Sequence, residues 1–246
     1  MNRVRAAVLA AAAVSGMVLA GLSWGRLEIG WDYARMKWHG PFKVEDRLAQ
    51  FGGRAKSRLA PHFAAAGAAF PPDEVALLAF KDARVLQLYA RAKDQSWRFV
   101  RTYPVLGASG VLGPKLREGD QQVPEGIYRV TLLNPNSRYH VSLRLDYPND
   151  FDVRMARGDR RSNLGGDIMI HGKNVSVGCL AVGDEAAEDL FVLAAQLLPA
   201  RMQVLISPTD FRHSASWLMP VTGSPQWTAD LYRRLETELR QFPRQS

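Results

Sequence analysis

Three strand-like runs follow one another in the middle of the chain and constrain its fold more than any other feature. They cover residues 74–81, 84–92 and 96–107, and only short polar breaks separate them. Such spacing is typical of consecutive antiparallel strands. Two further runs, at residues 127–135 and 138–147, continue the pattern. Since strands and helices do not alternate along the chain, we do not expect a doubly wound parallel sheet.

Helical segments flank these strands at residues 44–67, 184–198 and 226–241. Asp184 suits the N-cap of the second helix, and Pro199 ends it. The sequence therefore predicts an α+β, β-rich fold with mostly antiparallel strands and a few flanking helices. With 246 residues, of which 47% are hydrophobic, the chain can bury the core of one domain that carries a short appendage.

The N-terminus contains a stretch without charge at residues 6–25, preceded by Arg3 and Arg5 and closed by Arg26. About 20 apolar residues suffice to cross a bilayer, so we expect a signal peptide or, in preference, an uncleaved membrane anchor. Either alternative implies export.

The formal net charge of +8 is unevenly distributed. Residues 1–60 hold ten Lys or Arg against four Asp or Glu, a net of +6, so residues 61–246 carry only +2. A nucleic-acid partner would require a basic, aromatic patch on the folded domain, and the sequence indicates none. The basic excess beside the apolar stretch suits anionic lipid headgroups or a solvated helix.

The single cysteine of the chain, Cys179, follows a histidine, His171, by eight positions. Residues 166–170 resemble a short buried strand, so His171 and Gly172 mark a strand end, while Cys179 lies on a glycine-containing loop. Such a pair can face each other as an activated thiol requires. A buried inert thiol is one alternative, and a metal site of His171, Cys179 and His140 is another. One cysteine excludes an internal disulfide framework.

The motifs "IHG" and "SVGC", preceded by "VPEGIYRV", resemble the YkuD family of L,D-transpeptidases. The longer stretches "GPKLREGDQQVPEGIY", "LNPNSRYHVSLRLDYPN", "DIMIHGKNVSVGCLAVGD" and "ISPTDFR" resemble its YafK-like branch. This resemblance implies a periplasmic enzyme that acts on peptidoglycan stem peptides without a metal or cofactor. We expect a signal peptide or inner-membrane anchor at residues 1–26 and a basic helical linker at residues 27–72. The YkuD-type catalytic domain is expected at residues 73–212, followed by a helical extension packed on it at residues 213–246.

The resemblance also implies roles for individual residues. Cys179 would be the nucleophile, and His171 its proton donor and acceptor, because Val177 stands where many members have a second histidine. The Gly172 carbonyl would orient the imidazole, and the amides of Val177, Gly178 and Cys179 would form the oxyanion hole. An imidazolium partner would lower the pKa of the thiol. Provisional substrate contacts are Ser176, Lys115, Arg117, His140 and Arg212.

Cys179 is expected to form a thioester that an amine or water resolves. The preferred prediction is transpeptidation. The alternative is amide hydrolysis, which would release a lipoprotein or acceptor. A catalytically silent murein-binding module is a third reading. The segment 107–126 could close over the site, and we expect a monomer.

Overall fold

The computed structural model describes residues 40–197, 201–213 and 223–244. The chain divides into two compact units, residues 1–42 and residues 43–246, and the second contains every helix and strand discussed below. Its helices are α2 (Val44–Ala65), α3 (Asp150–Gly158), α4 (Asp184–Gln196) and α5 (Thr228–Leu239). The expected helices are present in the described part, and α3 is an addition that the sequence analysis missed.

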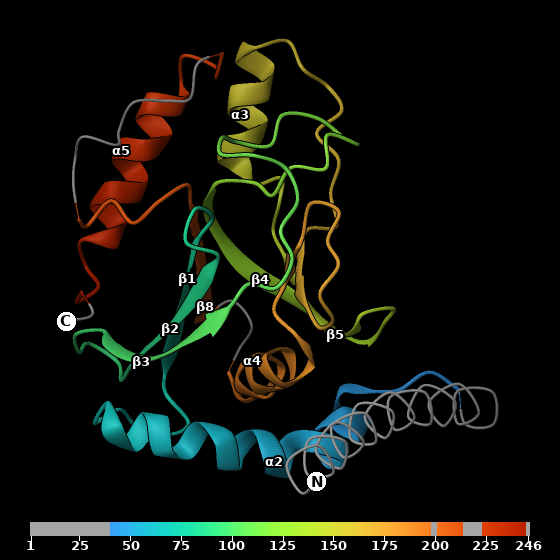
Figure 1. Cartoon of the computed structure of the whole chain (residues 1–246), viewed down its shortest axis with the longest axis vertical. Coiled ribbons are helices and arrows are strands. Elements are labelled where there is room, and N and C mark those ends of the chain that lie inside the picture. Colours follow the sequence, from blue (N-terminus) through green and yellow to red (C-terminus); the bar gives the residue numbers. More distant parts are fainter. Residues whose placement is uncertain (1–39, 198–200, 214–222, 245–246) are drawn as a thin grey trace, which may run out of the picture. The chain divides into compact units, whose positions relative to one another are not determined.

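Eight strands form one sheet in the order β3-β2-β1-β8-β4-β5-β6-β7 (Figure 1). They are β1 (Glu74–Phe80), β2 (Val85–Arg91), β3 (Arg98–Pro104), β4 (Gly126–Ser137), β5 (His140–Leu145), β6 (Met169–His171), β7 (Leu180–Ala181) and β8 (Met202–Ser207). Most neighbours are antiparallel, which confirms the expected fold class. The parallel pairs are β1 with β8 and β6 with β7.

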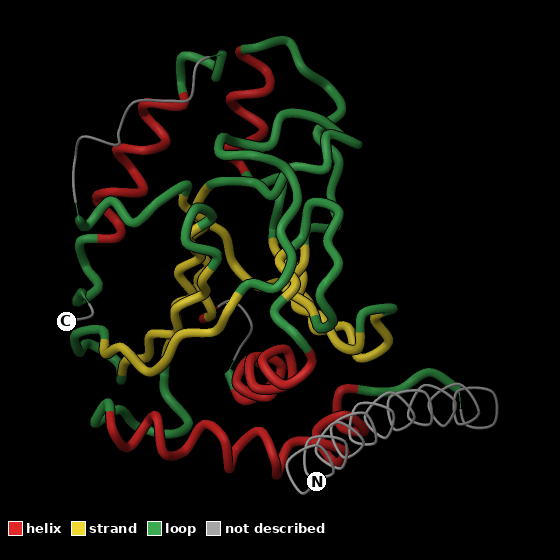
Figure 2. The backbone as a smooth tube through the Cα atoms, viewed as in Figure 1, coloured by secondary structure: helices red, strands yellow, loops and turns green. Residues whose placement is uncertain are grey.

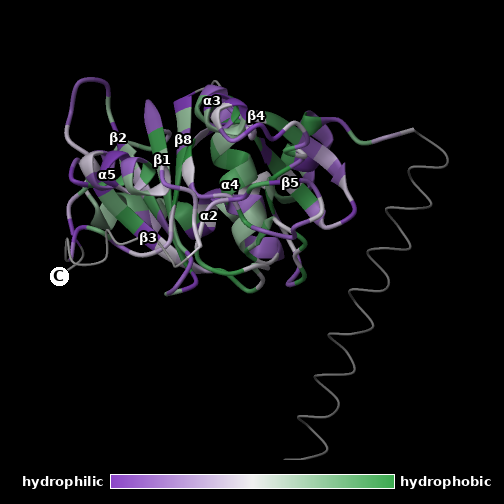
Figure 3. Cartoon of the chain, turned by 90° about the horizontal axis from the view of Figure 1, so that it is seen from above, coloured by the Kyte–Doolittle hydropathy of each residue, from purple (hydrophilic) through white to green (hydrophobic). Residues whose placement is uncertain are grey.

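Two apolar clusters hold the sheet between helices, because successive side chains of a strand point to opposite faces. On β1, Val75, Leu77 and Ala79 pack in the cluster that also contains buried residues of α2 and α4. The alternate residues, Ala76 and Leu78 among them, pack against α5 instead. Both faces of β1 are therefore covered, which explains why its sequence is almost continuously apolar. Figure 2 shows the helices around the strands, and Figure 3 shows the apolar character of α4.

Buried charges join α2 to α4 in addition to apolar packing. The Arg58 guanidinium lies 2.9 Å from the Glu188 carboxylate and 2.8 Å from that of Asp189. The Tyr103 hydroxyl donates to Asp189 as well, at 3.2 Å. These contacts fix α4 under the half of the sheet that carries His171 and Cys179.

A second buried ion pair anchors the end of the long segment that precedes β4. Lys81 Nζ lies 2.9 Å from Glu125 Oε1 and also donates to the carbonyls of Gly113 and Val123, at 3.0 and 3.1 Å. The Tyr232 hydroxyl of α5 donates to Glu125 Oε2 at 2.8 Å. One carboxylate thus connects β1, the long segment and the C-terminal helix.

Lys81→Met should destabilise the fold by about 3–5 kcal/mol, since removing one partner leaves the Glu125 charge buried without its counter-ion. Equilibrium urea unfolding followed by circular dichroism measures this change. Lys56→Met, at an exposed position of α2, is the control and should shift stability by less than about 0.5 kcal/mol. Equal stability of the two variants would contradict the structural role given to Lys81.

Candidate active site

The parallel pairing of β6 and β7 brings His171 and Cys179 to the same end of the sheet. Ile170 pairs with Leu180 and His171 with Ala181, so Cys179 lies beside Met169, the residue two positions before His171. Ile170 and Leu180 pack in the core with α4. Because alternate residues point to opposite faces, His171 and Cys179 both belong to the face turned away from α4.

The His171 ring is buried, with 2% of its surface exposed. Its Nδ1 lies 2.6 Å from the Gly172 carbonyl oxygen, which can only accept, so Nδ1 carries a proton and Nε2 keeps its lone pair. The Tyr139 ring stacks on the imidazole with a centroid distance of 4.6 Å. Burial lowers the pKa of His171 and outweighs the opposite effect of the Gly172 hydrogen bond. The imidazole is therefore neutral at pH 7 and able to accept a proton.

Gly172 is a glycine because its surroundings leave no room for a side chain. A Cβ atom there would lie 2.8 Å from the Tyr139 carbonyl oxygen and would also meet the Asp184 carboxylate. Asp184 does not cap α4 as expected. Its carboxylate instead accepts from the Lys173 amide at 2.8 Å and from Lys173 Nζ at 2.6 Å, which ties the turn after Gly172 to the start of the helix.

Cys179 is partly exposed, and its Sγ lies 3.7 Å from the Asp167 carbonyl oxygen. Burial raises the pKa of the thiol, and the negative charge of Asp167 adds to this effect, while a backbone hydrogen bond and the positive charge of Lys115 oppose it. The expectation of a thiol whose pKa is lowered by an imidazolium is therefore wrong for this structure. Desolvation disfavours both charged forms, so the resting pair is a neutral thiol and a neutral imidazole.

The turn before Cys179 is braced by two serine hydroxyls. Ser176 Oγ donates to the Cys179 carbonyl at 2.6 Å and accepts from the Cys179 amide at 3.0 Å. Ser109, from the long segment, accepts from the Gly178 amide at 2.6 Å. Two of the three amides expected to form the oxyanion hole are thus engaged by hydroxyls. The Val177 amide has no partner among the described residues, and its side chain is 70% exposed.

The basic residues expected at the substrate are mostly engaged elsewhere. Lys115 is buried, and its Nζ lies 2.5 Å from Asp120 Oδ1 and 2.9 Å from the Arg117 carbonyl. It acts on Cys179 only through its charge. The Arg117 side chain is exposed and lines a cleft of about 610 Å³ that contains neither Cys179 nor His171.

His140 and Arg212 have structural partners rather than open positions. His140 Nε2 lies 3.1 Å from Glu188 Oε1. The His140 side chain also packs close to Gly172, where a Cβ atom would lie 3.0 Å from His140 Cβ. The buried Arg212 guanidinium binds Asp210, Tyr89, Gln87 and the Pro243 carbonyl, all within 3.0 Å. These contacts lie beside α5 and β2, whereas Cys179 lies next to β6 and β7 at the other edge of the sheet. Arg212 fastens the C-terminal segment and does not face Cys179.

Tyr139, Ser109 and Asp167 touch the predicted catalytic residues, yet the sequence analysis assigned none of them to the site. Tyr139 falls within the strand expected at residues 138–147, whereas β5 begins only at His140. Ser109 lies 70 positions before Cys179 in the chain, so only the folded contact reveals it. No sequence signal marks Asp167.

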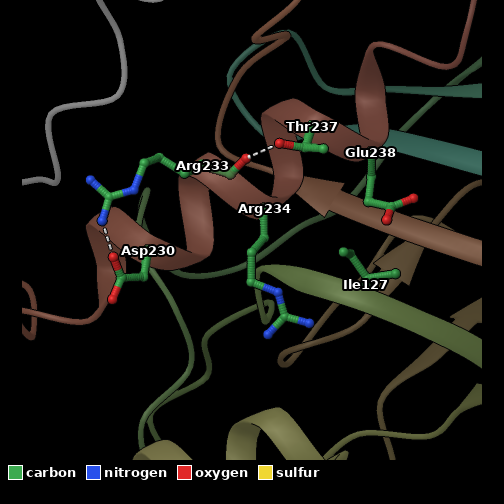
Figure 4. A pocket seen from close by; sticks show the side chains of 6 residues that line it. All are labelled: Ile127, Asp230, Arg233, Arg234, Thr237 and Glu238. Atoms are coloured by element: carbon green, nitrogen blue, oxygen red, sulfur yellow. Dashed lines mark hydrogen bonds and ion pairs between the residues drawn. The ribbon is translucent and has the colours of Figure 1, made fainter.

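Other features of the described residues do not add to the site. No group of three His, Cys, Asp or Glu side chains in residues 40–197, 201–213 and 223–244 is arranged to hold a metal ion. The same residues contain no helix that is both long and apolar enough to span a bilayer, and residues 6–25 lie outside them. A pocket of about 340 Å³ lies beside α5. Figure 4 shows the side chains that line it, and none of the predicted site residues is among them.

Comparison with known proteins gives a match to one family over more than half of the chain. The YkuD L,D-transpeptidase catalytic domain matches residues 76–206, a range that contains both His171 and Cys179. YafK from two strains of Escherichia coli is 35% identical over 136 residues, which cover 54% of this chain and 52% of YafK. The chain thus spans about half the length of the curated relatives it matches.

Solved structures give more distant similarities. The helical cell shape determining protein Pgp2 from Campylobacter jejuni has a TM-score of 0.45 at 15% identity, with 71% of this chain and 72% of Pgp2 covered. L,D-transpeptidase 1 from Mycobacterium tuberculosis has a TM-score of 0.32 at 16% identity, with 55% of this chain and 62% of that protein covered.

Alkylation of Cys179 by iodoacetamide should be slower at neutral pH than that of an unstructured peptide thiol, because burial raises the pKa of Cys179 and leaves less thiolate. The rate should continue to rise above about pH 8.5, where the peptide thiol is half ionised. Mass spectrometry of the labelled chain measures the rate. His171→Ala should leave the rate at mildly acidic pH unchanged. If Cys179 is labelled faster than the peptide thiol at that pH, and His171→Ala removes the difference, then the resting pair is a thiolate and an imidazolium after all.

Proposed function

Because the chain belongs to the YkuD family of L,D-transpeptidase catalytic domains, we propose that it is a cysteine-dependent L,D-transpeptidase of peptidoglycan stem peptides. The observation that carries this proposal is the position of His171 on β6 and of Cys179 directly before β7, the strand that pairs with β6, on one face of the sheet. His171 is neutral and held through Nδ1, which suits a base that works at Nε2. The proposed reaction needs no metal or cofactor.

In the proposed acylation step, the sulfur of Cys179 attacks the carbonyl carbon at the L-centre of the diamino acid in the stem peptide. The thiol proton passes to His171 Nε2, so the thiolate forms only as the carbon–sulfur bond forms. The carbon–nitrogen bond then breaks, and His171 returns the proton to the leaving amine. A thioester remains, and an acceptor amine attacks it in a second step of the same kind.

The developing oxyanion would lie at the turn before Cys179. The Val177 amide is available there, whereas the Gly178 amide donates to Ser109 in the resting enzyme. A substrate oxygen would compete with the Ser109 hydroxyl for this donor. Ser176 holds the Cys179 amide and carbonyl, so we assign Ser176 to the shape of the turn rather than to substrate binding.

Hydrolysis of the thioester is the alternative outcome, and the exposure of the turn supports it. Val175 and Val177 are 55% and 70% exposed, so water can approach this side of Cys179. An enzyme of this kind would release a lipoprotein or other acceptor from the diamino acid instead of forming a crosslink. Transfer depends on an acceptor that excludes water from the thioester.

Incubation of the purified chain with a disaccharide tetrapeptide should give a crosslinked dimer detectable by mass spectrometry. A parallel incubation with peptidoglycan bearing a lysine-linked peptide tests the alternative, since hydrolysis would release the lysine peptide without any dimer. Cys179→Ala should abolish both products, and His171→Ala should lower the rate by roughly 100-fold or more. No product from either substrate, with tight binding of both, would favour a murein-binding module.

We further propose that the catalytic unit faces the periplasm and that residues 1–26 direct its export. A C-terminal fusion to a reporter that is active only in the cytoplasm should therefore be silent, because the positive charges of Arg3 and Arg5 hold the N-terminus inside. Deletion of residues 1–26 should restore the reporter signal and controls for expression. A strong signal from the complete chain would overturn the proposal.

A further inference from the structure

A row of side chains extends from Cys179 across neighbouring strands on the face turned away from α4. Arg144 of β5 pairs with Met169 of β6, which in turn lies beside Cys179. Leu132 of β4 pairs with Arg144 on the other side. The neighbours of Arg144 and Met169 along their strands, Leu143 and Ile170, point the other way and pack in the core. Adjacent strands lie about 4.8 Å apart, so the Arg144 backbone is about 10 Å from that of Cys179.

Within this row, Arg144 carries a guanidinium that is open to solvent. Its side chain is 45% exposed, and the ion pair it forms is with the Asp167 carboxylate, at 3.1 Å. The Asp167 side chain is 75% exposed. Exposed ion pairs of this kind contribute about 0–1 kcal/mol, so another carboxylate can readily take the place of Asp167.

Asp167 connects this guanidinium to the thiol. Its carbonyl oxygen lies 3.7 Å from Cys179 Sγ and accepts from it, while its carboxylate pairs with Arg144. Asp167 also has a φ of +54°, a backbone conformation that aspartate tolerates better than most residues. One acidic residue therefore lies at the thiol and at the exposed arginine, next to the position where the proposed substrate would bind.

Lys115 and Arg161 are less available than Arg144. Lys115 is buried against Asp120. The Arg161 guanidinium binds Asp159 at 2.8 Å and the Leu116 carbonyl at 2.7 Å. Arg144 thus combines an exposed planar fork with a weak partner and a place on the same face as Cys179. That fork suits two parallel hydrogen bonds to a carboxylate.

We propose that Arg144 binds a free carboxylate of the acidic stem peptide and that Asp167 occupies this place when no substrate is bound. The proposal rests on the proposed function and names a specificity residue for it. Met169 and Leu132 supply the apolar floor on either side of Arg144. When the substrate carboxylate replaces Asp167, the Asp167 charge is free to turn toward solvent and away from the sulfur that must become negative during attack.

The test compares a tetrapeptide substrate that has its free side carboxylates with the same peptide in which they are amidated. Arg144→Gln should lower kcat/KM for the acidic peptide by about 10–100-fold, the range for a charge-assisted pair, mainly through KM. It should leave kcat/KM for the amidated peptide unchanged. Arg144→Lys should recover only part of the loss, because lysine lacks the fork. Asp167→Asn should lower KM for the acidic peptide by about two- to five-fold, since a weak competitor is removed.

Arg154→Gln, an exposed arginine of α3, is the matched control and should behave as the parent chain. An equal loss with both peptides, or no loss with the acidic one, would overturn the role of Arg144. Binding of the two peptides to the Cys179→Ala chain, measured by calorimetry, separates this proposal from the proposed function. If the parent chain is inactive but Arg144→Gln still weakens binding of the acidic peptide alone, only the proposed reaction fails. If neither peptide binds, both proposals fail.

Discussion

The pairing of β7 with β6 is the contact on which the candidate active site depends. β7 has two residues and β6 has three, so neither strand is stable by itself. A second neighbour holds β7 in place: the Leu106 amide donates to the Ala181 carbonyl at 2.8 Å, and the Ala181 amide donates to the Gly107 carbonyl at 2.9 Å. Gly107 can approach so closely because it has no Cβ atom; a Cβ atom there would collide with the Asn174 carbonyl. The register of Cys179 against Met169 follows from these few hydrogen bonds.

Desolvation determines the protonation of the resting site. Burial raises the pKa of Cys179 and lowers that of His171, so the same surroundings disfavour both charges. A thiol of this kind resists adventitious alkylation and oxidation while no substrate is bound. In the proposed reaction the proton must then move during the attack itself, which makes the alignment of the imidazole decisive. The Gly172 carbonyl and the Tyr139 ring supply that alignment from two sides.

Local patterns in the sequence predicted where strands and helices lie better than they predicted which strands pair with one another. The runs at residues 74–81, 84–92 and 96–107 became β1, β2 and β3 because their apolar character and short breaks are local properties. The parallel pairing of β1 with β8 joins segments more than 120 residues apart, and no local pattern encodes it. Helix α3 was missed because its sequence, DFDVRMARG, is short and contains as many charged as apolar residues, and it buries only Ala156. Its capping box at Asn149 and Asp152 was the available signal.

The same distinction explains the candidate site. His171 and Cys179 were found from a motif whose members are close in sequence, whereas Lys115 and Arg212 were chosen for their charge alone. Charge says little about availability, because the partners that engage a cation come from elsewhere in the fold. Arg212 is satisfied by β2 and by the C-terminal segment, and Lys115 by its own loop. Arg144 has the same charge but only an exposed partner, and strand register places it on the same face as Cys179, with Met169 between them.

The long segment before β4 is held at both ends, and this bears on how the proposed thioester could be protected from water. Ser109 is bonded to the Gly178 amide at one end, and Glu125 to Lys81 and Tyr232 at the other. Between them, Gln122 binds the carbonyls of Val111 and Gly113. A segment with so many internal hydrogen bonds must break several of them to close over Cys179, at a cost of about 1 kcal/mol each. Shielding by the bound acceptor itself would require no such rearrangement, so in the proposed reaction the acceptor that fits beside the turn at Val175 and Val177 would decide between transfer and hydrolysis.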